Sequence, residues 1–487
     1  MLHVTRPSPL LLTSALTLGL LSCSPGPPEG KRLNVLLVVI DTARADKFGC
    51  YGHGGGLTPR IDELASQGVL FQDSAAHAPW TLPSTASLLT SLHPQQHGAG
   101  GYLDLAPLET GGAPEVRFRG LADEVETVTE AFQRGGWRTG AIVNVDFLDQ
   151  EFGLTQGVHD LDAAWYESNT EVRSATTTTD LALKWLDERG DEPFFLLAHY
   201  FDAHAVYEPP QEFRQRFAAP QDRSSTNFVF GTRQHMLLLR AGQLDLEPAL
   251  IERAERLYEA ELAYVDAEVG RLLDGLEKAG LGEDTLVVLT ADHGEEFLDH
   301  GGFEHGHTLY DELIRVPLVM RLSGHLASGT VVGGTTPLVD VAPTLCDLAG
   351  LEVPTSFSGR SLLPAMRGEA PPQRPILAHG NFWGEPLVSW RSGRWKLILD
   401  PRGGEGERFE LYDLEADPGE LTDLASSQPD RVAALLEEYR SVEALLEARA
   451  EGRPVELDEA GKRRLQALGY MGSEELEETA DEDGGAE

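Results

Sequence analysis

The sequence predicts an α/β fold, with a large, wound and mostly parallel sheet flanked by helices, followed by a small C-terminal α+β subdomain. Three apolar runs support this prediction: Leu33 to Ile40, Pro193 to Ala198 and Thr285 to Thr290. Nearly continuous aliphatic and β-branched runs are typical of strands buried on both faces of a parallel sheet. A weaker run at Gly140 to Val143 is interpreted in the same way. With 487 residues, the chain is long enough for one large domain and a smaller one.

Helical patterns alternate with these strands, as expected of a wound α/β domain. In the longest pattern the apolar residues follow a three/four spacing, which is typical of a helix that lies on a sheet. The predicted helices are Pro59 to Gln67, Glu124 to Arg134, Thr179 to Glu188 and Ala249 to Lys278.

The pattern changes after Pro375. Glu385 to Asp400 and Arg408 to Asp413 predict antiparallel strands, and Pro429 to Ala450 predicts a closing helix. The final residues are acidic and nearly free of apolar side chains, which is typical of a disordered tail. We therefore expect a main domain at 33–374, a C-terminal subdomain at 375–472 and a tail at 473–487.

The N-terminus predicts export. A mostly apolar run from Leu10 to Leu21 follows Arg6 and is too short to span a bilayer comfortably, so residues 1–22 are interpreted as a signal peptide. The ending Leu20-Leu21-Ser22-Cys23 resembles a bacterial lipobox, which implies cleavage before Cys23 and acylation of that cysteine. Residues 23–32 are then a tether. The expected location is the bacterial envelope, at the periplasmic or outer membrane face, and the alternative is a plain secretory signal.

Charge and cysteine content restrict the partners. The chain has 39 basic and 79 acidic residues, a formal net charge of −40, which argues against nucleic acid or an anionic membrane surface as a partner. Membrane contact is expected only through the N-terminal lipid. A site for an anionic substrate therefore needs local positive charge, most simply a metal ion. Beyond Cys23 only Cys50 and Cys346 remain, so no disulfide framework is expected.

Chemically versatile side chains follow the predicted strands. In open α/β sheets, ligands bind beyond the carboxyl ends of the strands, so such residues are site candidates. They are Asp41, the pair Asp292 and His293, the group His199, Asp202 and His204, and Asn144.

The stretch Ala78 to Gly98 supplies a candidate nucleophile. Thr81 lies two residues before Pro83, which opens an apolar run typical of a short helix with proline in its first turn. Unpaired backbone N–H groups and the positive end of the helix dipole favour an alkoxide there. The ordinary alternative is that Thr81 only caps the helix.

Asp41, Thr81, Asp292 and His293 together form a possible ligand set for one divalent ion. Metal bonding would lower the pKa of the Thr81 hydroxyl and activate it as a nucleophile. Oxygen ligands with one imidazole favour zinc or manganese, with calcium or magnesium possible. The alternative for the Asp-His pair is a hydrogen-bonded turn.

Six ordered motifs carry a family resemblance. They are NVLLVVIDTARAD from Asn34 with CYG at Cys50, TPRIDELASQGVLF from Thr58, TLPSTASLLT from Thr81, TADHGEEF from Thr290, LYDELIRVPL from Leu309 and ELYDLEADPGE from Glu410. With these motifs the chain resembles the sulfatases of the alkaline phosphatase superfamily, from about Asn34 to Gly472. The resemblance implies an alkaline phosphatase-like fold and a sulfatase-like catalytic domain at 33–374.

The resemblance also implies roles for single residues. Asp41, Asp292 and His293 match metal ligands, and Thr81 matches a residue that is both ligand and nucleophile. His204, in HYFDAH, matches a histidine that touches the transferred group. His305, in EHGHTLYDE, matches a second one, and His307 is its close rival.

The chain departs from the family pattern at the nucleophile. Sulfatases carry Cys or Ser where this chain has Thr81, because that residue is oxidised to formylglycine, and threonine would give a ketone. Thr85 replaces an arginine, Thr42 replaces a second acid, and no lysine-tryptophan-histidine motif surrounds Trp137. A plain threonine nucleophile is similar to the phosphodiesterase, pyrophosphatase and phosphoethanolamine or phosphoglycerol transferase branches.

We therefore expect a metal-dependent hydrolase of sulfate or phosphate esters, with phosphoester chemistry favoured. Its substrate is expected to be a small anionic ester or an envelope glycan or lipid. The alternatives are a phosphoethanolamine- or phosphoglycerol-type transferase and a catalytically inactive binding lipoprotein. Tyr207 to Glu247 either covers the site or is a surface excursion. A second metal ion would have as candidate ligands Asp202, His199, His307 and His379.

Overall fold

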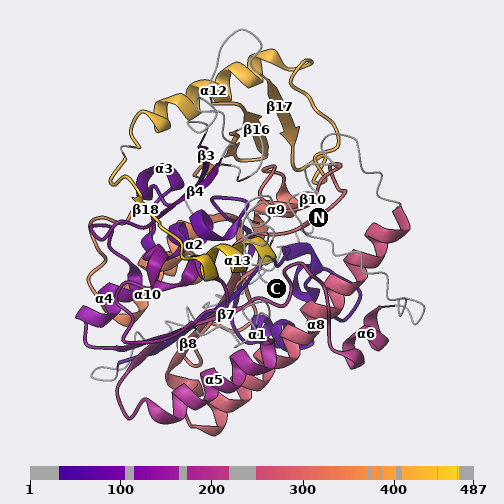
Figure 1. Cartoon of the computed structure of the whole chain (residues 1–487). Coiled ribbons are helices and arrows are strands. Elements are labelled where there is room, and N and C mark those ends of the chain that lie inside the picture. The colour runs from indigo at the N-terminus through magenta and orange to yellow at the C-terminus, as the bar shows by residue number, and fades with distance from the viewer. Residues whose placement is uncertain are drawn as a thin grey trace, which may run out of the picture.

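The computed structural model describes residues 32–104, 115–163, 173–218, 248–370, 374–380, 382, 386–401, 408–446, 448–468 and 470. At the centre of this part of the chain is a sheet of nine strands in the order β11-β2-β12-β8-β1-β7-β5-β6, with β13 also paired to β2 (Figure 1). The strands are β1 (Asn34–Ile40), β2 (Val69–Ala75), β5 (Arg138–Ile142), β6 (Asp160–Asp162), β7 (Phe194–Tyr200), β8 (Thr285–Ala291), β11 (Arg315–Val316), β12 (Leu318–Arg321) and β13 (Thr330–Pro337).

The central strands are parallel, which confirms the predicted fold class. β1 pairs in parallel with β7 on one side and β8 on the other, whereas β12 runs antiparallel to both β8 and β2. All seven residues of β1, β7 and β8 are buried, as expected of strands covered on both faces. Their carboxyl ends therefore meet at one edge of the sheet.

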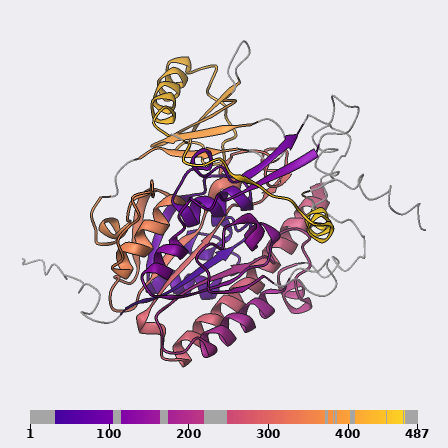
Figure 2. The ribbon, with the colours of Figure 1, turned by 60° about the vertical axis from the view of Figure 1, so that its left-hand side comes forward.

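Helices cover both faces of the sheet (Figures 1 and 2). One layer holds α1 (Pro59–Gln67), α5 (Ala175–Glu188) and α8 (Pro248–Lys278). The opposite layer holds α2 (Thr81–Thr90), α4 (Val128–Arg134) and α10 (Val341–Ala349). Shorter elements connect them, namely α3 (Pro94–His97), α6 (Gln211–Phe217), α9 (Asp311–Ile314), α11 (Leu363–Met366) and the two-stranded β9 (Glu296–Phe297) and β10 (Phe303–Glu304).

The predicted α+β subdomain is present at the top of Figure 1. It consists of the antiparallel strands β14 (Ile376–His379), β15 (Val388–Ser392), β16 (Trp395–Leu399) and β17 (Phe409–Asp413), with α12 (Pro429–Glu443) packed against them. It has its own hydrophobic core, built around Trp390, Leu397 and Leu435.

The chain leaves this subdomain before the predicted boundary at residue 472. β18 (Arg453–Pro454) pairs with β4 (Glu115–Gly120), which in turn pairs with β3 (Gly100–Asp104). After β18 comes α13 (Glu459–Ala467), a helix missed by the sequence reading, which Figure 1 places near the middle of the molecule, apart from α12. Leu465 and Tyr470 are part of the main core. The segment is short and polar, and two apolar positions are too few to show the spacing that would predict a helix packed on the core.

Several predicted boundaries shift for local reasons. α4 begins at Val128 instead of Glu124, because Thr127 and Glu130 form a capping box there. α12 ends at Glu443, seven residues before the predicted end. β7 continues to Tyr200 and so includes His199.

Other sequence predictions lie outside the described residues. These are the signal peptide, Cys23, the acidic tail and most of the stretch between Tyr207 and Glu247. Within the described ranges, no helix combines the length and apolar character needed to cross a membrane. Cys50 and Cys346 are both free thiols.

Candidate active site

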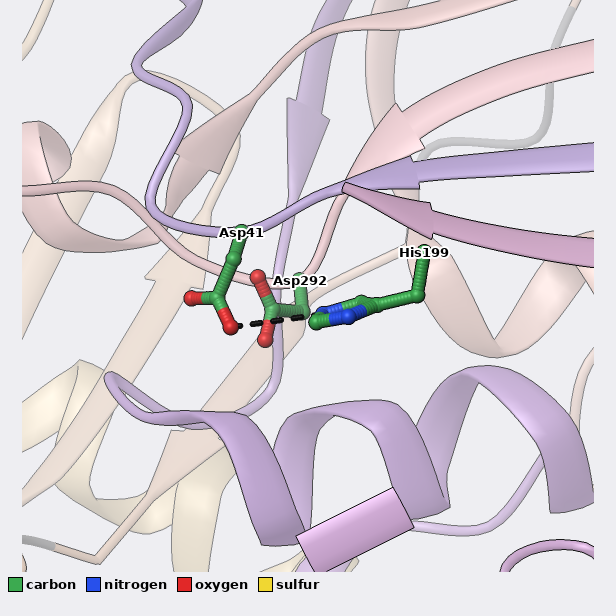
Figure 3. A group of neighbouring side chains, drawn as sticks. All are labelled: Asp41, His199 and Asp292. Carbon is green, nitrogen blue, oxygen red and sulfur yellow. Dashed lines mark ion pairs between the residues drawn. The ribbon is translucent and has the colours of Figure 1, made fainter. Parts of the chain in front are cut away.

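The three central strands bring three ionisable side chains together at their carboxyl ends. Asp41 directly follows β1, His199 is the sixth residue of β7, and Asp292 directly follows β8. One ligand atom from each residue lies within 4.8 Å of the others, and Nε2 of His199 is 3.3 Å from Oδ2 of Asp41. Figure 3 shows the three side chains directed toward one region beyond the strand ends.

His293 and Thr81 complete this cluster. Nε2 of His293 lies 3.4 Å from Oδ1 of Asp41 and 3.6 Å from Oδ2 of Asp292. The Thr81 hydroxyl oxygen lies 3.3 Å from the same nitrogen. The structure thus brings together the four side chains that the sequence assigned to one metal ion, and it adds His199.

Thr81 is the first residue of α2 and does not cap it. The cap position belongs to Trp80, which makes no side-chain cap hydrogen bond. The Thr81 hydroxyl is therefore available to the cluster and lies near the positive end of the helix dipole. Ser84, one turn further on, donates a hydrogen bond of 2.5 Å to the backbone oxygen of Asp292 and so ties α2 to the end of β8.

The hydrogen-bond pattern of the cluster fits a bound cation. Both carboxylate oxygens of Asp41, Oδ2 of Asp292 and both ring nitrogens of His199 are buried without a hydrogen-bond partner among the described residues. Nδ1 of His293 lies 2.9 Å from the backbone oxygen of Gly294, so Nδ1 carries the proton and the Nε2 lone pair faces the two carboxylates. Buried lone pairs that face one another repel unless a cation lies between them.

Burial sets the protonation preferences of these groups. It raises the pKa of Asp292 to about 6, with the charge of Asp41 as a further cause, and it raises the pKa of Asp41 well above its usual value. Burial also lowers the pKa values of His199 and His293 to about 4. Both imidazoles therefore favour the neutral form, which is the form that binds a metal.

Two further predicted histidines lie beside this cluster and meet at the Tyr470 hydroxyl. Nε2 of His305 is 3.0 Å from that oxygen, and Nε2 of His204 is 3.3 Å from it. The other ring nitrogen is anchored in each case, His305 to Glu295 at 2.8 Å and His204 to the backbone oxygen of Ala205 at 2.6 Å. Burial raises the pKa of the Tyr470 phenol, and an interaction with the Thr81 side chain lowers it.

His307, the rival of His305, has a different partner. Its Nε2 lies 2.7 Å from Oε2 of Glu296, so its ring is held by β9 and is not part of the group around Tyr470. The geometry therefore favours His305 as the residue that faces the transferred group.

The candidate ligands for a second ion do not converge. His199 belongs to the Asp41 cluster, His307 is paired with Glu296, Asp202 accepts a hydrogen bond from the backbone of Ala175, and His379 lies on β14. Within the described ranges, the only set of at least three such ligands is Asp41, His199 and Asp292. The prediction that these four residues could together hold a second metal ion is therefore wrong. They lie on elements that do not meet at one point.

Thr42, which departs from the family pattern, and the site candidate Asn144 both have structural partners. The Thr42 hydroxyl donates 2.8 Å to the backbone oxygen of Ala203, so it holds the loop after β7. The Asn144 amide donates to the backbone oxygen of His199 and, at 2.9 Å, to the Thr178 hydroxyl. Asn144 thus positions the strand that carries His199.

Sequence reasoning missed two contributions to the site. His199 was considered only for a second ion, because the predicted strand ended at Ala198; the β1–β7 register, which pairs Val39 with His199, places it beside Asp41. Tyr470 gave no signal, since it follows a short polar helix far from every other site residue.

Known proteins similar to this chain include both sulfatases and phosphonate monoester hydrolases, which places it among the hydrolases of sulfate or phosphate esters. Within that class, the chain belongs to the sulfatase family, whose sequence profile matches residues 33–351. A second profile, for the C-terminal part of N-sulphoglucosamine sulphohydrolase, matches residues 298–442.

Two characterised relatives align over most of their length. An N-acetylglucosamine-6-O-sulfatase of Bacteroides thetaiotaomicron is 26% identical over 86% of this chain and 87% of its own. A multifunctional alkaline phosphatase superfamily protein of Trinickia caryophylli is also 26% identical, over 84% of this chain and 94% of its own.

Solved structures support the fold. The phosphonate monoester hydrolase of Agrobacterium radiobacter has a TM-score of 0.67 at 23% identity and covers 88% of this chain and 100% of its own. A protein solved in complex with its substrate D-glucosamine-2-N,6-O-disulfate has a TM-score of 0.66 at 22% identity, covering 84% and 98%.

Proposed function

We propose that the protein is a metal-dependent hydrolase that uses Thr81 as its nucleophile, with phosphoesters favoured over sulfate esters as substrates. One observation carries the proposal: the Thr81 hydroxyl lies 3.3 Å from a lone-pair nitrogen of His293, beside buried carboxylates without hydrogen-bond partners in the described chain. A hydroxyl in such surroundings is a candidate fifth ligand to a cation.

The proposed metal ligands are Asp41, Asp292, His199, His293 and Thr81. Two imidazoles beside carboxylate and hydroxyl oxygens suit zinc or manganese better than calcium or magnesium, which prefer oxygen. When bound there, the divalent ion lowers the pKa of the Thr81 hydroxyl and offsets the charge of an anionic ester. This local charge is needed because the chain as a whole carries −40.

In the first step, the Thr81 oxygen attacks phosphorus, or alternatively sulfur. The bond from Thr81 to that atom forms and the bond to the leaving oxygen breaks. The Thr81 hydroxyl proton passes to His204 or His305, and that histidine gives it to the leaving oxygen. An anionic ester beside the two imidazoles favours their protonated form. Water then attacks the Thr81 ester, releases the acid and returns a proton to the Thr81 oxygen.

The side chain at position 81 favours phosphoryl chemistry. A formylglycine aldehyde cannot form from threonine, so the route by which an aldehyde hydrate eliminates sulfate is closed. A phosphothreonine ester can be cleaved by an activated water. The sulfatase relatives support sulfate esters as the alternative substrates, and the fold shared with a phosphonate monoester hydrolase is compatible with phosphorus.

Intact-protein mass spectrometry tests this proposal. The enzyme is mixed briefly with an aryl phosphodiester or an aryl sulfate and quenched in acid, and the expected product is a Thr81 adduct whose mass identifies the transferred group. Thr81→Ala should abolish both the adduct and turnover, whereas Thr81→Ser should retain part of each. Thr90→Ala, at the other end of α2, controls for damage to the helix. Full activity of Thr81→Ala on both esters would sink the proposal.

The envelope location is a separate proposal. It is supported by the apolar N-terminal run and by the Leu20 to Cys23 motif. Mass spectrometry of the N-terminal peptide from the native host should find a lipid-modified Cys23, and an unmodified mature N-terminus would contradict the lipid anchor.

A further inference from the structure

A tyrosine from the far C-terminus reaches the reacting groups. The Tyr470 hydroxyl lies 3.0 Å from His305 and 3.3 Å from His204, and it interacts with Thr81. These are the proposed nucleophile and the two proposed proton donors. The phenol oxygen therefore occupies the space between the groups that, in the proposed reaction, attack the ester and protonate its leaving oxygen.

The ring of Tyr470 lies in an aromatic pocket. Its centroid is 4.7 Å from that of Phe147 in an edge-on contact, 5.5 Å from Phe382 and 6.5 Å from Trp80. Phe118 stacks on Phe382 behind it, with centroids 5.7 Å apart. The Tyr470 side chain thus occupies a site that fits a phenol. Its ring packs on aromatic side chains, and its oxygen lies beside the reacting groups.

This arrangement closes the site. Thr81 is 0% exposed, Tyr470 is 2% exposed, and His204 and His305 are 4% and 5% exposed. An ester that contacts Thr81 and both histidines needs the space that the Tyr470 hydroxyl occupies between His305 and His204. Substrate and Tyr470 therefore cannot occupy their positions together.

The segment that carries Tyr470 is held mainly by single side chains, and its Leu457 and Leu468 are only partly buried against the main core. Leu465 is the only large apolar side chain of α13 that is fully buried, and Arg464 pairs with Asp146 at 2.8 Å. The Tyr470 backbone N–H donates 2.8 Å to the backbone oxygen of Leu465, so the tyrosine and the helix are coupled. Elements with few buried apolar contacts open at low free-energy cost compared with the core.

We propose that α13 and Tyr470 form an intramolecular lid, that Tyr470 marks the leaving-group pocket, and that the lid withdraws when an aromatic leaving group takes the place of its ring. This rests on the proposed function, because it assigns Thr81, His204 and His305 to the reaction. It adds a substrate class, esters of phenols, and a residue that competes with substrate.

Kinetics with matched variants test the lid. The closed lid reduces apparent affinity by the fraction of open enzyme, so Tyr470→Ala should lower KM for an aryl phosphodiester about tenfold while kcat changes little. Tyr470→Phe retains the ring and loses the hydrogen bonds, so its KM should fall less. Tyr439→Ala, which removes a buried tyrosine from α12, should leave KM unchanged. A drop of kcat by about 100-fold in both Tyr470 variants, as expected when a direct hydrogen-bond donor is lost, would overturn the proposal.

Hydrogen exchange gives a readout that does not need turnover. Amides of α13 in Thr81→Ala should exchange faster when bis(4-nitrophenyl) phosphate is added, and dimethyl phosphate, which has no ring, should have a smaller effect. Unchanged or slower exchange of α13 with the aryl ester bound would rule out withdrawal of the lid. If Thr81→Ala remains active, the proposed nucleophile fails, yet the exchange experiment still reports whether a phenol ester displaces Tyr470.

Discussion

The Thr81 hydroxyl oxygen lies 3.3 Å from Nε2 of His293, although 212 positions separate the two residues in the chain. Nε2 of His293 is the acceptor in this contact, because the proton of His293 is on Nδ1, which faces the backbone oxygen of Gly294. A hydroxyl and a lone pair therefore meet beside the carboxylates of Asp41 and Asp292. This pairing joins the end of β8 to the start of α2, and it underlies both the proposed metal site and the proposed nucleophile.

The Asp41 carboxylate should have opposite effects on stability with and without metal. In metal-free protein, Asp41→Asn should raise the free energy of unfolding by about 1–2 kcal/mol, because it relieves the repulsion between Asp41 and Asp292, both 0% exposed. At a zinc concentration 100 times the Kd, the free energy of unfolding of wild type should rise by about 2.7 kcal/mol. That of the variant should rise much less. Chemical denaturation with and without a chelator measures both effects.

The matched control for this prediction is Asp202→Asn. Asp202 is a half-buried carboxylate two residues after the strand that carries His199, but its Oδ1 accepts a hydrogen bond from the backbone of Ala175. The Asp202→Asn variant should be stabilised by zinc as much as wild type is. If Asp41→Asn and wild type respond equally to zinc, the ion does not bind at Asp41.

The hydrogen bond from Ser84 to the Asp292 backbone should matter for activity as well as for stability. Ser84→Ala removes a 2.5 Å hydrogen bond between α2 and the end of β8. We expect a loss of about 1–2 kcal/mol in unfolding free energy. A drop of about tenfold in kcat/KM should accompany it, because Asp292 is no longer fixed relative to Thr81.

Ser87 provides the comparison on the same helix. Its hydroxyl lies 3.1 Å from Nε2 of His97, the last residue of α3. Ser87→Ala should have a similar effect on stability and leave kcat/KM within about twofold of wild type. Equal losses of activity in the two variants would mean that Ser84 acts only through general stability.

The sequence predicts most of the fold because its strands are buried on both faces. The apolar runs of β1, β7 and β8 are unambiguous, and the acids that follow β1 and β8 are already suspected as ligands from their place in the sequence. Local patterns cannot determine register, however. The alignment of Val39 with His199 moves that histidine from a possible second site into the first.

The C-terminal contribution to the site could not be predicted for a different reason. α13 has nine residues and only one large, fully buried apolar side chain, so its sequence gives little indication that it packs on the main core. Tyr470 is positioned by tertiary contacts with Phe147, Phe382 and the two histidines. No local property of the sequence indicates that the chain returns from the subdomain to the sheet edge.

The buried lysine between the main domain and the subdomain should be essential for stability. Lys396 on β16 is 0% exposed, and its Nζ lies 2.8 Å from Oδ1 of Asp311 and 2.8 Å from Oε1 of Glu420. Lys396→Met should cost about 3–5 kcal/mol, because it leaves the buried Glu420 carboxylate and the partly buried Asp311 carboxylate without this cation. Combining it with Asp311→Asn and Glu420→Gln should recover much of the loss. Urea unfolding of the single and triple variants measures this, and Lys184→Met, at an exposed pair with Glu188, should have little effect.

The pair of His300 and Glu312 should make stability depend on pH above neutrality. Nδ1 of His300 lies 2.6 Å from Oε1 of Glu312, and hydrogen bonding to that carboxylate raises the pKa of His300 to about 9 against burial, which alone would lower it. Because the folded pKa exceeds the unfolded value near 6.5, the stabilisation is complete below pH 6.5 and is lost as pH rises through 9. The free energy of unfolding of wild type minus that of His300→Gln should therefore fall by on the order of 2 kcal/mol between pH 6.5 and 9.5. Guanidinium titrations across this range measure the difference, and Glu312→Gln should remove the same dependence; a difference independent of pH would show that His300 is uncharged in the folded protein.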